Sequence, residues 1–324
     1  MAHKPRILFF DIFRIVCIAL IVYTHFKFFW LPTLNGIDLN TFLFQDESFC
    51  NLYPKSIALL AVSGMIFVSG AVLEYNYKSI STFLEYKLFI LKRFVRLYPI
   101  YWISLILASV LLYIASQTIM PNFNHVIFNP SIFLAILGLG GNDLNLMGWF
   151  IGAIFTMYLI FPVMSKMMQK NPYLSIIAFA SITFSFRYFM TPVISYNWLR
   201  SIPLYNLFEF GLGIFVVQRG LFPKNVHDYP AISKLADFSF YVFLFHLVVI
   251  QLMAPDNLLF HISSLALVYP VVGNVFWAGI AIVNNPYLNY VFIAAEVLVV
   301  SVIAMAIDER LQKIIRERLP RITN

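Results

Sequence analysis

The feature that most constrains this chain is a series of apolar stretches, each about as long as a membrane-spanning helix. Such a helix needs about 20 mainly apolar residues. Only 11% of the 324 residues are charged, against about 25% in a typical soluble domain. We therefore predict an all-α, polytopic membrane bundle. The expected spans are 7–29, 57–76, 97–117, 147–168, 172–190, 203–218, 237–254 and 286–307.

Two weaker stretches leave the number of spans between eight and ten. The stretch "PSIFLAILGLGG" (130–141) is short and ends in glycines, and 263–283 is interrupted by Pro270 and Gly273. If both cross or neither does, the two termini lie on the same side. The first stretch is too long and too charged for a signal-peptide core, so we expect it to be retained. We expect a single integral-membrane domain over 1–324, with no soluble domain.

The flanking charges predict an orientation. Basic residues precede the first span and crowd both the 77–96 segment and the C-terminal tail, whereas 31–56 carries three acids and one lysine. The positive-inside rule therefore places both termini and the 77–96 segment in the cytoplasm. We expect a multi-pass protein of the cell (plasma) membrane. One group of basic residues fits this orientation only if 130–141 does not cross: Lys166, Lys170, Arg219 and Lys224.

The segment 77–96 mixes apolar and basic residues at helical spacing, as an interfacial helix does. Either it anchors the chain at the membrane surface, or its Arg93 and Arg96 line the cytoplasmic mouth of a site. The two cysteines, Cys17 and Cys50, show no metal-ligand spacing, and no basic patch suggests a nucleic acid. We expect no metal and no nucleic-acid partner; the partner surface is the lipid bilayer.

The first span carries Asp11, Arg14 and His25. A charge at the bilayer centre costs roughly 2.5–3.5 kcal/mol, so such groups usually face a protein interior. Arg14 and His25 lie within about 20° on the helix surface and roughly 16 Å apart along its axis. We therefore expect them to point into one cavity at different depths, with Asp11 as a structural partner of Arg14. The alternative is that Arg14 reaches the cytoplasmic surface and His25 is a core histidine.

The stretch "FDIFRIVCIALIVYTH", with arginine, ten residues and histidine, resembles the opening of the acyltransferase-3 family of integral-membrane acyltransferases. Further stretches are similar to the motifs of that family in the expected order, which extends the resemblance over about residues 6 to 250. They are "MIFVSGAVL" (65–73), "LKRFVRLYPIYW" (91–102), "GWFIGAIFTMYLIFP" (148–162), "LFEFGLGIF" (207–215) and "DFSFYVFLFHL" (237–247). Where many members have Glu-Glu-Gln-Phe-Tyr, "IFTMY" keeps only Tyr158.

The resemblance implies transfer of an acyl group, often acetyl (O-acetylation), from cytoplasmic acyl-CoA to a hydroxyl of a glycan or lipid-linked carbohydrate. In this chemistry a base takes the proton of the hydroxyl, and His25 is the expected general base. The donor carries phosphates, which suit the planar fork of arginine. We therefore expect Arg14, Arg93 and Arg96 to bind the donor.

Glu209 is a second intramembrane acid. It either pairs with an arginine such as Arg14 or Arg187, or serves catalysis by orienting His25 or holding the acceptor hydroxyl. Ser69 and Gly70 we interpret mainly as structural, because small residues let membrane helices approach closely.

Several aromatic residues and a second histidine are candidates for contact with the acceptor. Tyr158 and Trp149, with Tyr101 and Trp102, offer rings that stack on sugars. His246, in the apolar "FLFHLVV", is either a substrate contact and second base or a histidine bonded to a neighbouring backbone carbonyl.

A proton-coupled transporter or flippase is the main alternative function. Buried charges such as the Asp11, Arg14 and His25 series also describe a proton pathway. The absence of a visible internal repeat and the ordered motifs favour the acyltransferase.

Overall fold

The computed structural model confirms the predicted all-α bundle. It describes residues 6–35, 57–77, 80–117, 131–139, 145, 147–194, 196–223, 225–227, 229–253 and 286–318. The long helices are α1 (Leu8–Asn35), α3 (Ile57–Asn76), α4 (Phe83–Gln117), α7 (Gly148–Lys170), α8 (Pro172–Met190), α11 (Pro230–Met253) and α13 (Pro286–Arg318). The short elements are α6 (Ser131–Leu137), α9 (Tyr196–Ser201), the 3-10 helix η1 (Pro203–Tyr205), α10 (Leu207–Gln218) and the strands β1 (Arg6–Ile7) and β2 (Val226–His227).

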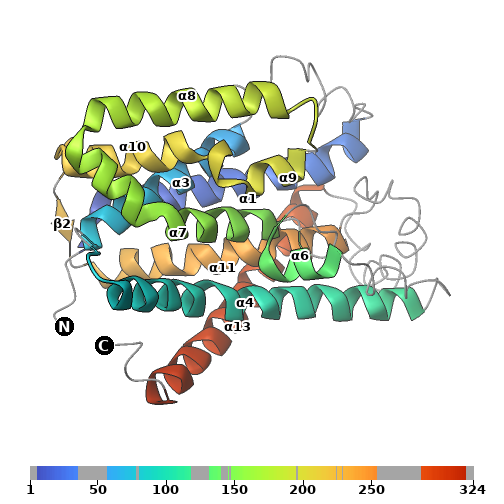
Figure 1. Cartoon of the computed structure of the whole chain (residues 1–324). Helices are drawn as coiled ribbons and strands as arrows, with labels where there is room; N and C mark the ends of the chain where they lie inside the picture. Colours follow the sequence, from blue (N-terminus) through green and yellow to red (C-terminus); the bar gives the residue numbers. More distant parts are fainter. Residues whose placement is uncertain are drawn as a thin grey trace.

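Most helices run side by side, and α13 crosses the others obliquely (Figure 1). In the described part of the chain, six helices are long and apolar enough to cross a membrane: α1, α3, α4, α7, α8 and α11. The predicted span 286–307 lies within α13, whereas 263–283 lies outside the described residues. The prediction that 203–218 forms a membrane-spanning helix is wrong. Its α10 has 12 residues, or about 18 Å, which is shorter than a hydrocarbon core of ~30 Å.

The prediction of a separate interfacial helix at 77–96 is also wrong, because α4 runs without a break from Phe83 to Gln117. Its start is a capping box: the Glu85 N–H donates to Thr82 Oγ1, and the N–H groups of Ser81 and Thr82 donate to Glu85 Oε2. Arg93 and Arg96 therefore project from a rigid helix, not from a loop.

The short helix α6 resolves the doubtful stretch 130–141. Its seven residues span only about 10 Å, and Gly138 ends it with a φ of 69°. Three aromatic side chains of α4 hold its carbonyls, since Tyr98, Tyr101 and Trp102 each donate a hydrogen bond to α6. This stretch does not cross as a helix, so α7 returns toward the end of the bundle where α1 begins.

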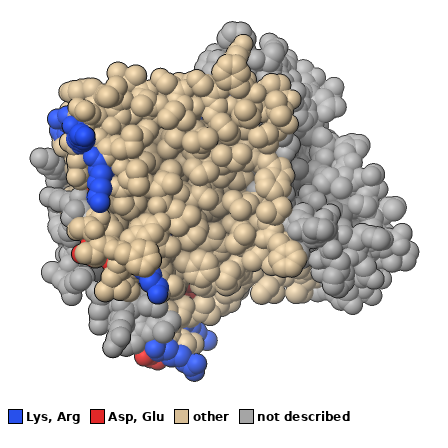
Figure 2. All heavy atoms as spheres, in the orientation of Figure 1, with Lys and Arg blue, Asp and Glu red and all other residues tan. Residues whose placement is uncertain are grey.

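Charge gathers at that end. On the face shown in Figure 2, Lys and Arg lie along one edge and around the lower end, while the middle of the face is uncharged. Antiparallel pairing of Arg6 with His227 and Ile7 with Val226 fixes the start of α1 there, and α13 ends on the same side (Figure 1). We call this the charged end of the bundle.

The contact between α3 and α10 depends on two glycines. A Cβ at Gly70 would lie 2.2 Å from the carbonyl oxygen of Phe210, and one at Gly213 would lie 2.1 Å from that of Phe67. Neither backbone leaves room for a methyl group, so Gly70 and Gly213 lie at a close contact between α3 and α10. Ser69 donates its hydroxyl hydrogen bond to Met65 O within α3.

We predict that Gly213→Ala destabilises the protein by about 1–3 kcal/mol, the usual cost of overpacking a filled interior. Gly64→Ala is the matched control on α3, because its added Cβ would meet the side chains of Cys17 and Phe13, which can shift. Thermal unfolding in detergent should show the larger loss for Gly213→Ala. Equal midpoints for Gly213→Ala and wild type would contradict the backbone contact.

Candidate active site

A pocket of about 470 Å³ lies at the charged end, between α1, α3, α4, α7 and α11. The three arginines predicted to bind a donor, Arg14, Arg93 and Arg96, all line it, and so does Tyr158. The charged residues of its lining are Arg6, Arg14, Lys92, Arg93, Arg96, Asp11 and Asp237. Five basic side chains face two acidic ones, so this basic pocket carries an excess of positive charge.

Arg6 binds both acids. Its guanidinium makes a bidentate pair with Asp11, at 2.7 and 2.8 Å, and a third bond of 2.9 Å to Asp237. Partial burial works to lower the Arg6 pKa, but the two carboxylates outweigh it and raise that pKa, so Arg6 stays charged. The partner predicted for Asp11 was Arg14; both Asp11 oxygens instead accept from Arg6, because β1 brings Arg6 beside the first turn of α1.

The remaining arginines are left to face the pocket. Arg14 makes no hydrogen bond or ion pair within the described part of the chain. Arg93 lies over the rings of Tyr77 at 5.0 Å, Phe89 at 5.7 Å and Tyr158 at 5.8 Å, and its buried Nε has no hydrogen-bond partner there. Arg96 is half-exposed and lies 3.8 Å from Asp237. Aromatic faces thus orient Arg93 without neutralising it.

His25 and His246 form a hydrogen-bonded pair that joins α1 to α11. His25 Nδ1 lies 3.0 Å from His246 Nε2. His246 is fully buried, and its Nδ1 lies 2.7 Å from Phe243 O and 3.1 Å from Val242 O. The backbone bond considered for His246 is therefore present. The contact with His25 was not predicted, because the two residues are 221 positions apart.

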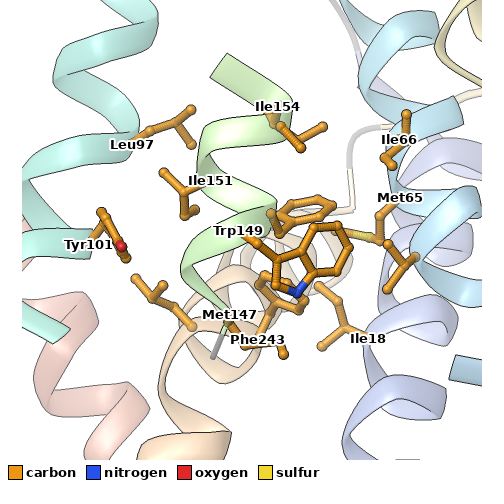
Figure 3. Packing of buried hydrophobic residues seen from close by; sticks show 14 of the residues in the cluster. Ile18, Met65, Ile66, Leu97, Tyr101, Met147, Trp149, Ile151, Ile154 and Phe243 are labelled. Carbon is orange, nitrogen blue, oxygen red and sulfur yellow. The ribbon is translucent and has the colours of Figure 1, made fainter. Parts of the chain in front are cut away.

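The basic pocket does not reach this histidine pair. Ile18 and Ile21 occupy the same face of α1 as Arg14 and His25, between the two, and are 2% and 0% exposed. Figure 3 shows Ile18 packed near Met65, Trp149 and Phe243. The single cavity predicted for Arg14 and His25 is wrong in this state. We call these four side chains, together with Ile21, the apolar layer.

The aromatic residues predicted to stack on sugars are mostly structural. Trp149 is only 3% exposed and belongs to the core, and Arg200 lies 4.4 Å above its ring. Tyr101 is fully buried and donates to Ala135 O, and Trp102 donates to Ile136 O. Of these four residues, only Tyr158 lines the basic pocket, where Arg93 lies 5.8 Å from the centre of its ring.

Glu209 has the arginine partner that was one of its two predicted alternatives. Arg187 Nη2 donates to Glu209 Oε1 at 2.7 Å, and Arg187 also donates twice to Tyr205 O. The hydrogen bonds of His25 and His246 within the described residues do not include Glu209. The geometry gives Glu209 a structural role between α8 and α10 and no contact that would support a catalytic one.

Four residues of the site were missed from the sequence. Lys92 and Arg6 were interpreted only as flanking charges, and Asp237 only as the first residue of the motif 237–247. Arg200, on α9, lies within electrostatic reach of His25. A usable signal existed for Asp237, since an acid at the start of an apolar span requires a basic partner. Nothing local points to Arg200.

The family model described as an acyltransferase domain matches residues 7–232. The match covers every element from α1 to the first turn of α11, and ends before His246. No curated protein and no solved structure matches the chain.

We predict that Arg187→Leu lowers the free energy of unfolding by about 3–5 kcal/mol, because it leaves the buried Glu209 carboxylate unpaired. Glu209→Gln should cost less, since a side-chain oxygen remains for Arg187. The control is Arg219→Ala, which removes an exposed guanidinium over Tyr173 and should change little. Thermal unfolding in detergent checks this order, and a wild-type midpoint for Arg187→Leu would disprove it.

Proposed function

The chain belongs to the acyltransferase-3 family, and we propose that this membrane acyltransferase moves an acetyl group from cytoplasmic acetyl-CoA to a hydroxyl of a glycan or lipid-linked carbohydrate. The observation that carries the proposal is one helix, α1, that presents Arg14 to a pocket of excess positive charge and His25 to a buried histidine partner.

The basic pocket is the proposed donor site. Coenzyme A carries several phosphate charges, and arginine binds such oxyanions bidentately. Arg14 and Arg93 are suited to this role because the described part of the chain offers them no carboxylate partner by hydrogen bond. Arg96, which is half-exposed, is suited to first capture of the donor. The excess positive charge also raises the local concentration of an anionic donor.

His25 is the proposed general base. The acceptor hydroxyl oxygen attacks the thioester carbonyl carbon while its proton passes to His25. The carbon–sulfur bond then breaks, and the departing thiolate takes the proton from His25. The products are an O-acyl ester and coenzyme A with a free thiol. A positioned base contributes typically about 10²–10⁴-fold in rate.

The apolar layer separates the two ends of this reaction. Arg14 and His25 are roughly 16 Å apart along α1, a span suited to the extended arm that links the phosphates of the donor to its thioester. The side chains of Ile18 and Ile21 must move aside for the arm to pass. While these two side chains stay in place, the apolar layer keeps water in the basic pocket away from the histidine pair.

We predict that His25→Ala reduces transfer by at least about 10²-fold with the fold intact, because no base remains to take the proton. The assay is incorporation of label from [14C]acetyl-CoA into glycans and lipids of membranes from the source cells. Glu209→Gln is the matched comparison and should retain transfer per folded molecule. Full transfer by His25→Ala would remove His25 from the mechanism, and transport without label incorporation would favour the transporter alternative.

Arg14→Lys should weaken acetyl-CoA binding despite its retained charge, because an ammonium cannot make the bidentate contact. Calorimetric titration of the purified protein with acetyl-CoA measures the change. Arg96→Lys should lose less affinity, since Arg96 lies closer to water. Unchanged affinity in Arg14→Lys would show that the donor phosphates bind elsewhere.

The proposed orientation places the charged end in the cytoplasm of a cell expressing the protein in its plasma membrane. Its support is the clustering of basic residues at that end (Figure 2) and the failure of α6 to cross, which leaves Lys166, Lys170 and Arg219 on the same side. A cytoplasmic donor can then reach the basic pocket directly.

Labelling of single cysteines tests this orientation in a Cys17→Ser, Cys50→Ser background. Lys170→Cys, at the end of α7, should react with a membrane-impermeant maleimide only after the cytoplasmic side is opened. Val193→Cys, just past α8 and 74% exposed, should react from outside. The reverse pattern would separate the basic pocket from a cytoplasmic donor.

A further inference from the structure

We infer that His246 is a positioning residue that fixes the tautomer of His25, with the proton of the His25 ring on Nδ1 and the lone pair on Nε2. The inference rests on the proposed function only for the use of that lone pair. The tautomer itself follows from three distances between described atoms.

The first step is the proton on His246 Nδ1. This atom lies 2.7 Å from Phe243 O and 3.1 Å from Val242 O. A carbonyl oxygen can only accept a hydrogen bond. His246 Nδ1 therefore carries a hydrogen and donates it to the backbone of its own helix.

The second step is the lone pair on His246 Nε2. A neutral imidazole with a hydrogen on one nitrogen has an acceptor on the other. Charging either ring is unfavourable here, because His246 is fully buried and Arg200 lies within electrostatic reach of His25. The hydrogen bonds of the pair within the described residues include no carboxylate that would offset such a charge. His246 Nε2 is therefore the acceptor.

The third step transfers this constraint to His25. Its Nδ1 lies 3.0 Å from His246 Nε2, so Nδ1 must donate. The other nitrogen, Nε2, then holds the lone pair and points to the opposite side of the ring from His246. The orientation of a catalytic histidine is commonly set by the bond that its second nitrogen makes. Here a neutral histidine takes the place that a carboxylate occupies in many such pairs.

The α11 backbone that accepts the hydrogen bond of His246 is held in place by a buried asparagine. Asn145 Nδ2 donates to Leu244 O, in the turn of α11 that precedes His246, and to Ser104 Oγ on α4. Both Asn145 and Ser104 are fully buried. The carbonyls around Phe243 are therefore fixed against α4 and the start of α7, so the position of His246 is fixed as well.

A spectroscopic test addresses the tautomer without any acceptor. In purified protein with 15N-labelled histidine, His25 should show a protonated Nδ1 and a bare Nε2. In His246→Leu the nitrogen signals of His25 should shift to a mixture of tautomers. A protonated Nε2 in wild type, or a His25 signal unchanged in His246→Leu, would overturn the inference whether or not the protein transfers acetyl groups.

A kinetic test addresses the consequence, with the membrane assay and [14C]acetyl-CoA. In His246→Leu the kcat should fall by about 10²-fold, with the KM for acetyl-CoA unchanged, since a wrong tautomer alone can cost as much as ~10⁴-fold. His246→Gln should recover most of the loss, because its side-chain oxygen can accept from His25 Nδ1. Val248→Ala, which removes buried volume from the same helix, should leave kcat near wild type.

The two tests separate the two claims. Wild-type kcat in His246→Leu would overturn the positioning role while leaving the acyltransferase proposal intact. Absence of transfer in wild type, together with the expected nitrogen signals, would refute the proposed acceptor or donor and support the tautomer.

Discussion

The three hydrogen bonds of Arg6 are the interaction on which the rest of the site depends. Asp11 and Asp237 lie on two helices that meet at the charged end, and Arg6 binds both carboxylates. Because these acids are already paired, Arg14 and Arg93 keep their charge for a ligand. Loss of Arg6 would leave two unpaired carboxylates among the four remaining basic side chains of the pocket and so weaken its preference for an anion. A two-residue strand pairing, Arg6 and Ile7 with β2, thus sets the electrostatics of the candidate donor site.

The bundle separates two kinds of polar group by an apolar layer. At the charged end, permanent charges line the basic pocket, and the buried carboxylate of Asp11 is paired there with Arg6. In the interior, the polar groups of the histidine pair need no charge, because each ring donates one hydrogen bond and the backbone of α11 accepts the last of them. A permanently charged base in this place would cost several kcal/mol of desolvation. A neutral pair avoids that cost and remains able to take a proton during a reaction.

Sequence patterns succeeded where the relevant contacts are local and failed where they are distant. The helical spacing of Arg14, Ile18, Ile21 and His25 is visible in the sequence, yet it was interpreted as a cavity wall, although two of its four positions are isoleucines that fill the space. Glu209 was correctly considered as a partner of Arg187, since both are charges in apolar helices. Trp149 was interpreted as a ligand contact because aromatic side chains serve both in cores and in sugar sites, and only burial distinguishes the two.

The sequence by itself determined that this chain is a helical membrane bundle and that α1 presents Arg14 and His25 on one face, because both follow from apolar length and from helical periodicity within single segments. It also determined the family, through short motifs in fixed order. Only the tertiary structure decided that Arg6 takes Asp11, that α6 stops short of crossing, and that His246 reaches His25. The pairing of Arg6 with Asp11 depends on the contact of β1 with the distant β2, and the other two depend on contacts with α4 and with α11. The free energy of such contacts leaves no periodic signal in the sequence of either segment.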